Sequence, residues 1–275
     1  CIRDRFNLCF VIVFDMGVAG VALATIISQY ISAGLCLYLL LTTKGTHRIV
    51  PSKVKIHKEL LGEILKYGLP SGFQNSIIGL ANVVVQSNIN SFGDMAMAGC
   101  GAYSKIEGFA FLPITSFTMA LTTFVGQNLG ARQYDRGLKG AKFGMICSMT
   151  LAEIIGVIIF VFSPQFVAAF DATPEVIHFG TLRGQTSAFF FCLLAYSHCV
   201  SAILRGAGKS MVPMIVMMVC WCFVRVTGLT IMGALVHNIW CVYWIYPITW
   251  SLSSIVFFLY LSLIHISEPT RPLYI

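Results

Sequence analysis

Charged residues are scarce in this 275-residue chain, at 11%, whereas hydrophobic residues make up 57%. A soluble domain carries roughly 25% charged residues, so this chain would expose a large apolar surface if it folded in water. The scarcity of charge excludes an ordinary soluble domain and predicts a multi-pass membrane protein. The lipid also excludes open β-sheets, because their edges would leave backbone groups without hydrogen-bond partners. The expected fold class is all-α.

Metal-binding patterns are missing as well. The ten cysteines are scattered along apolar stretches, and no group of histidines and cysteines has the spacing of a zinc site. The pair in "CWC" at 220–222 would lie about 200° apart on a helix, too far round to hold one ion. We therefore expect no metal site and no cofactor, and we interpret the cysteines as small packing residues.

Long uncharged runs are what the sequence has instead. A helix needs about 20 apolar residues to cross the hydrocarbon core of a bilayer. The runs predict about seven transmembrane helices, at 18–43, 64–90, 95–124, 143–163, 183–204, 211–236 and 239–264. Residues 6–14 predict the end of a preceding helix, an N-terminal stub.

The basic residues explain the net charge of +7 through topology. Arginines and lysines gather in alternate connections, at 44–63, 132–142 and 205–209, which the positive-inside rule places in the cytoplasm. Arg183 is the one basic exception, at the edge of an otherwise acidic or uncharged loop. We therefore expect the lipid bilayer as the partner and no nucleic acid. Residues 131–142 predict either a short helix in the membrane interface or a solvated loop.

The stretch "LRGAGKS" at 204–210 looks like part of a phosphate-binding loop. Such a loop needs a glycine where Ile203 stands, and it joins a strand to a helix. Here the stretch joins two predicted membrane helices, so we interpret it as a turn in which Gly206 and Gly208 allow the reversal. Arg205 would then lie at the lipid headgroups. We expect no nucleotide and no enzymatic activity.

Neutral amides line up in the predicted helix at 64–90. Asn75, Asn82 and Gln86 are spaced so that they fall on one helix face. Such a stripe can line a water-filled cavity or hydrogen-bond neighbouring helices, and both interpretations stay open. Gln74 is a further candidate for the same cavity.

The next predicted helix holds two charges, Lys105 and Glu107, and Glu107 lies six residues before Pro113. An ionisable group inside a membrane span is costly, so it is a candidate functional residue. Glu107 could bind a cation or carry a proton in the cavity. Alternatively, it forms a structural ion pair with Lys105 or with Arg225 from another helix.

Four other residues in the spans are candidates of lower weight. His198 could titrate near neutral pH, although a hydrogen-bonded helix histidine fits as well. Arg225 faces either the cavity or a carboxylate. Pro247, in "WIYPITW", predicts a bent helix beside the cavity. Glu153 has mostly apolar neighbours, which favours a structural role.

Five stretches in this order resemble the multidrug and toxic compound extrusion (MATE) family of transporters. They are "GVAGVALATIISQ" at 17–29, "GLPSG" at 68–72, "VGQNLGA" at 125–131, "LRGAGKSMVP" at 204–213 and "YPITW" at 246–250. The motif residues that carry the resemblance are Pro70, Gly126, Gln127, Asn128, Gly130, Arg205, Gly206, Gly208 and Pro247.

The resemblance implies two six-helix lobes around a central cavity that opens to one side at a time. It implies a secondary antiporter, monomeric when full length, that exports small organic cations or drugs in exchange for Na⁺ or H⁺. A multi-pass protein of a cell membrane, and a bacterial inner membrane, is the expected location. A flippase of lipid-linked precursors and a non-transport membrane scaffold are the alternatives.

The resemblance also divides the chain. Residues 1–43 would be the end of the N-terminal lobe, 44–63 a cytoplasmic connection and 64–264 the whole C-terminal lobe. Residues 265–275 match nothing in the family and are interpreted as a possible cloning or sequencing scar. Sodium-coupled members usually carry a carboxylate in the first helix of this lobe. The stretch at 67–93 has none, so the coupling ion stays open.

Overall fold

The computed structural model describes residues 2–45, 48–51, 55–236 and 238–267. In these ranges the chain consists of helices joined by short turns, and no strand occurs among them. The predicted all-α fold class is therefore confirmed. The chain divides into two compact units, residues 1–61 and 62–275, each of which is described by itself.

The first unit is a helical hairpin. The helix α1 (Ile2–Leu8) continues as a wider π-helical turn, η1 (Cys9–Val13), and α2 (Gly17–Thr42) follows. The reversal between them uses left-handed backbone conformations at Asp15 (φ 49°) and Gly17 (φ 52°). The predicted stub at 6–14 lies in α1 and η1, and the predicted helix at 18–43 is α2.

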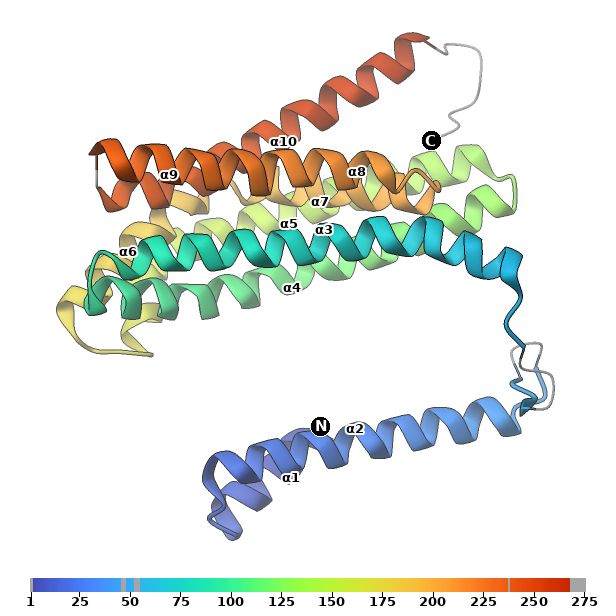
Figure 1. The fold of residues 1–275 in the computed structure, drawn as a ribbon, viewed down its shortest axis with the longest axis horizontal. Helices are drawn as coiled ribbons and strands as arrows, with labels where there is room; N and C mark the ends of the chain where they lie inside the picture. The colour runs from blue at the N-terminus through green and yellow to red at the C-terminus, as the bar shows by residue number, and fades with distance from the viewer. Residues whose placement is uncertain (1, 46–47, 52–54, 237, 268–275) are drawn as a thin grey trace. The chain divides into compact units, whose positions relative to one another are not determined.

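The second unit is a helical bundle (Figure 1). Within it, α4 and α5 pack against each other and against both α6 and α7, while α10 packs against α6, α7 and α9. Its elements are α3 (Lys58–Asn90), α4 (Asp94–Gly130), α5 (Tyr134–Ala168), α6 (Pro174–Ala188), α7 (Phe191–Gly206), α8 (Met211–Met217), the π-helical turn η3 (Met218–Phe223), α9 (Val224–Val236) and α10 (Ile239–Ser267).

Five helical stretches among the described residues are long and apolar enough to cross a membrane. These are Gly17–Thr42, Asp94–Gly130, Tyr134–Ala168, Met211–Gly233 and Ile239–Leu263. The predicted span at 183–204 is instead divided between α6 and α7, which are bent by 59° at a short break and could together form a sixth span. The prediction of one continuous helix there is wrong.

Two further predictions need correction. The predicted span at 64–90 is helical, as α3, but it is not among the stretches that are apolar enough to span. Its many amides and flanking charges explain this, because each polar group lowers the hydropathy of the window. Residues 134–142 form neither a separate interface helix nor a loop, since they are the first turns of α5.

A buried serine network joins α7 to its neighbours. The Ser197 hydroxyl lies 2.9 Å from the hydroxyls of both Ser253 and Ser254 on α10. The indole of Trp221, on η3, donates to the Ser253 hydroxyl at 3.1 Å. Ser254 in turn donates to the carbonyl of Leu193. Such interhelical hydrogen bonds between small side chains hold membrane helices in close register.

Glycines let two helix pairs approach closely. A Cβ on Gly99 of α4 would lie 2.6 Å from the Val176 carbonyl oxygen of α6. A Cβ on Gly156 of α5 would lie 2.3 Å from the carbonyl oxygen of Ala188, at the end of α6. Since no real Cβ tolerates such contacts, these positions fix the distance between backbones. The second one sets where the break between α6 and α7 lies against α5.

Candidate functional site

A polar cavity of about 500 Å³ lies within the second unit. Its wall combines amides from α3, one ion pair, a second arginine and aromatic rings. The lining residues are Asn75, Ile78, Asn82, Val85, Gln86, Ser104, Glu107, Gly108, Phe111, Arg183, Leu194, His198, Trp221, Arg225, Tyr246 and Trp250.

The amide stripe of α3 lies at this cavity. Asn75, Asn82 and Gln86 line it together, as their shared helix face requires. Val85, which also lines the cavity, and Ile89 are buried in a cluster with residues of α4, α9 and α10. The Gln86 amide donates to Asn90 at 2.9 Å within the same helix. The geometry thus favours the cavity over helix-to-helix bonding as the environment of the stripe.

Glu107 contributes the carboxylate of the cavity, and its ion-pair partner is Arg183. The Arg183 Nη2 lies 3.6 Å from the Glu107 Oε2, and the two side chains are 5% and 18% exposed, respectively. Arg183 also donates to the carbonyl of Cys100 at 3.3 Å. The predicted pairing of Glu107 with Lys105 or Arg225 is therefore wrong, because a third helix supplies the cation.

Arg183 is a site residue that the sequence reasoning missed. It was interpreted as a loop charge, whereas it is buried within α6 and lines the cavity. The available signal was its position as the one exception to the alternation of basic loops. A cation that breaks the topological pattern needs a partner inside the bundle.

Arg225 lines the cavity from α9 and is 2% exposed. Its Nη2 donates to the Thr249 hydroxyl of α10 at 2.9 Å. Its guanidinium carbon lies 5.2 Å from the centre of the Trp221 ring and 4.6 Å from that of Tyr246. Arg183 lies 5.1 Å from the same tyrosine ring, so two cations share one aromatic neighbour.

His198 contacts rings instead of hydrogen-bonding groups. It packs edge-on against Phe111 at 5.0 Å and against Trp221 at 5.3 Å. Its buried Nε2 has no hydrogen-bond partner among the described residues. The prediction of a hydrogen-bonded helix histidine is therefore not confirmed at Nε2. His198 lines the cavity instead.

Two candidates from the sequence are not at the cavity. Lys105 is exposed, and Gln74 is buried elsewhere on α3 with no partner for its Oε1 among the described residues. Neither lines the polar cavity. On α4, Lys105 is two positions from Glu107, and residues so spaced point in different directions.

The motif residues position helices around the cavity. Gly208 has φ +80° and makes the turn after α7, as expected. Gly206 is the last residue of α7 and allows α7 to approach α4, because a Cβ on Gly206 would lie 2.6 Å from the Thr122 carbonyl oxygen. The stretch 204–210 therefore ends one helix and precedes another, without a strand.

The remaining motif residues hold the ends and middles of helices. Asn128, buried near the end of α4, donates to the carbonyl of Phe124 at 2.8 Å, and Gln127, Gly126 and Gly130 flank it. Arg205 donates to the Ser201 hydroxyl at 2.9 Å. The two prolines, Pro70 and Pro247, are buried inside α3 and α10, respectively.

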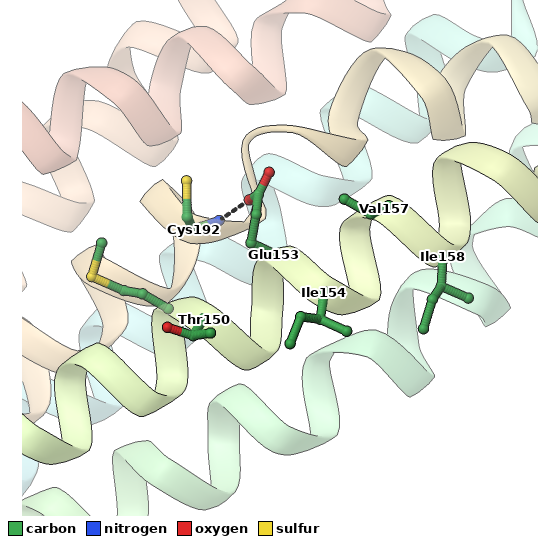
Figure 2. Close-up of a pocket in the computed structure, with 7 residues that line it drawn as sticks. Thr150, Glu153, Ile154, Val157, Ile158 and Cys192 are labelled. Carbon is green, nitrogen blue, oxygen red and sulfur yellow. Dashed lines mark hydrogen bonds between the residues drawn. The ribbon is translucent and has the colours of Figure 1, made fainter.

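A second cavity, of about 560 Å³, lies between α5 and the start of α7 (Figure 2). It is mostly apolar, and Glu153 is its one carboxylate. The backbone N–H of Cys192 donates to the Glu153 Oε2 at 3.1 Å, in the first turn of α7. A carboxylate there satisfies a free N–H group of the helix and its dipole, which is a structural role. The polar cavity is therefore the candidate site.

A bundle of span-length apolar helices with a charged cavity is one of the architectures found among membrane transporters. The model of the MatE family matches residues 70–230, more than half of the chain. The chain therefore belongs to this family, whose members are transporters and not enzymes.

Curated relatives include proteins described as multidrug resistance proteins. One from Thermotoga maritima, "Probable multidrug resistance protein NorM", is 28% identical over 74% of this chain and 43% of its own length. "Probable multidrug resistance protein YpnP" from Bacillus subtilis is 29% identical over 78% of this chain and 48% of its own. The chain thus spans about half the length of these relatives.

Solved structures share the fold. "Outward-facing conformation of a multidrug resistance MATE family transporter of the MOP superfamily" has a TM-score of 0.87 and 20% identity, with 98% of this chain and 62% of that one covered. "Reverse polarity of binding pocket suggests different function of a MOP superfamily transporter from Pyrococcus furiosus Vc1 (DSM3638)" has a TM-score of 0.88 and 20% identity, with the same coverage.

Proposed function

We propose that this chain forms part of a secondary active antiporter that exports organic cations or drugs in exchange for Na⁺ or H⁺. The observation that carries the proposal is the polar cavity that Glu107 and three neutral amides line together on an otherwise apolar bundle. Polar groups in a membrane span are costly, so their concentration around one cavity supports a transport path.

Glu107 is the residue at which exchange would occur. Its contact with Arg183, at 3.6 Å, is longer than the 2.7–2.9 Å of a strong charged hydrogen bond. Glu107 therefore has a partner that keeps it stable without saturating both oxygens. A proton, a sodium ion or an organic ammonium group competes for the same carboxylate, and the entry of one favours release of another.

Neutral amides suit this competition. Asn75, Asn82 and Gln86 offer carbonyl oxygens that can complete the shell of a cation without adding charge. A hard cation such as Na⁺ prefers oxygen ligands of this kind. The proposed coupling ion is therefore Na⁺ or H⁺, since a single carboxylate can bind and release either one.

The remaining features of the proposal come from the family. The proposed transport activity belongs to a longer, two-lobed protein in which residues 64–264 form the C-terminal lobe. The chain's coverage of about half of its curated relatives supports this part of the proposal. We propose a multi-pass location in a bacterial inner membrane and a monomeric transporter.

The test is drug export from cells that express the protein. Ethidium efflux is measured while a pH or Na⁺ gradient is imposed, first for the unaltered protein and then for Glu107→Gln. This change keeps the size of the side chain and removes its charge, so gradient-driven efflux should fall to background with normal membrane insertion. Glu63→Gln, an exposed Glu-to-Gln change at the start of α3, is the matched control. Normal efflux by Glu107→Gln in both gradients would refute the role of this residue.

A further inference from the structure

Arg225 is a buried cation in the wall of the polar cavity. It is 2% exposed, and within the described part of the chain its one side-chain hydrogen bond goes to the neutral hydroxyl of Thr249. No carboxylate among the described residues lies within ion-pair distance, and the Arg225 Nε has no hydrogen-bond partner there.

Such an arrangement is costly unless a ligand compensates it. An ion that leaves water without a counterion loses hydration free energy that only a well-placed partner returns. The flanking rings of Trp221 and Tyr246 recover part of this loss through cation–π contacts. They leave the donor capacity of the guanidinium free, because a ring supplies no hydrogen-bond acceptor in its plane.

The charge of the cavity wall points the same way. Two arginines, Arg183 and Arg225, stand against one glutamate, Glu107, so with His198 neutral the lining has a formal charge of +1. The carboxylate is engaged by Arg183. Arg225 is therefore the arginine of this wall that has no ion pair among the described residues.

The guanidinium is also held in place. Thr249 fixes one end of the Arg225 side chain by a hydrogen bond, while the two rings restrict its plane. A planar donor fork that is already ordered loses little entropy when it binds a planar carboxylate through two hydrogen bonds. The amides of Asn75 and Asn82 line the same cavity and can donate to the same anion.

We infer that Arg225 anchors a carboxylate subsite, and that the preferred substrates are amphipathic zwitterions. Their carboxylate binds Arg225, and their cationic centre binds at Glu107. The second half of this inference rests on the proposed function, which assigns cation exchange to Glu107. The first half depends only on Arg225 and its surroundings.

The test compares two dyes that differ in one group. Rhodamine 110 has a free carboxylate, which is a methyl ester in rhodamine 123, and both carry the same cationic ring system. Binding to the full chain in lipid nanodiscs is measured by fluorescence anisotropy. We expect the dissociation constant of rhodamine 110 to be at least about tenfold lower, the ratio that one charged hydrogen bond supplies.

Variants locate the preference. Arg225→Gln should abolish it by weakening the binding of rhodamine 110 alone, Arg225→Lys should keep part of it, and Thr249→Val should reduce it severalfold. Arg136→Gln, an exposed arginine at the start of α5, is the matched control and should leave both constants unchanged.

Several results would overturn the inference. If the unaltered chain binds the two dyes equally, or binds neither, the inference is overturned before any variant is measured. Equal weakening of both dyes in Arg225→Gln shows a structural role only. The failure of the proposed function is separate, since ethidium export that does not depend on Glu107 leaves an Arg225-dependent preference in nanodiscs untouched.

Discussion

Gly156 controls the position of the break between α6 and α7, and Gly156→Ala tests this directly. The added Cβ would lie 2.3 Å from the Ala188 carbonyl oxygen and 3.3 Å from the Phe191 ring, whereas ordinary contact begins near 3.4 Å. Since the obstacle is backbone, α6 and α7 must move away from α5. The displaced elements include the helix that carries Arg183.

The magnitude follows from overpacking. Forcing a methyl group into a packed core costs typically about 1–3 kcal/mol. For a chain of this size each kcal/mol lowers the melting temperature by about 2–4 °C, so a fall of about 2–12 °C is expected. The assay is fluorescence-detected gel filtration after heating in detergent, which follows loss of the folded protein.

The matched control is Gly101→Ala. Gly101 is also a helical glycine, in α4, but a Cβ there meets nothing within 4 Å. Alanine favours helix by up to about 1 kcal/mol over glycine, so this variant should melt at the same temperature or higher. If Gly156→Ala melts like Gly101→Ala, the close approach of α5 to the break is not real, and the placement of α6 fails with it.

Three further outcomes are expected. Arg183→Gln leaves Glu107 without its buried partner and should destabilise the protein by about 3 kcal/mol or more. Adding Glu107→Gln should recover part of the lost melting temperature, whereas strictly additive losses would show that the two side chains do not interact. Lys209→Ala should leave ethidium efflux within severalfold, because 204–210 is a turn between helices, and nucleotide binding that vanishes in this variant would contradict that interpretation. A cysteine replacing Arg136, in a protein without other cysteines, should react with impermeant reagents only from the cytoplasmic side, and labelling of intact cells from outside would reverse the topology.

Much of the fold could be predicted from the sequence, because local composition determines it. Uncharged runs of about 20 residues form helices in lipid whatever their neighbours, so most helix positions followed from hydropathy, whereas the break between α6 and α7 did not. The amide stripe could be predicted for the same reason. The spacing of Asn75, Asn82 and Gln86 puts them on one side of a helix before any partner is known.

The contacts between helices were decided only by the tertiary structure. Composition marked Glu107 as a costly buried charge, but its partner Arg183 comes from α6, and no local pattern links the two. Gly206 is needed because the Thr122 carbonyl of α4 lies against it, a contact that the motif around it does not reveal. That no carboxylate among the described residues lies within ion-pair distance of Arg225 is likewise a property of the assembled bundle. Ion pairing and close packing depend on distances of a few ångströms between helices, and hydropathy and helical periodicity do not specify those distances.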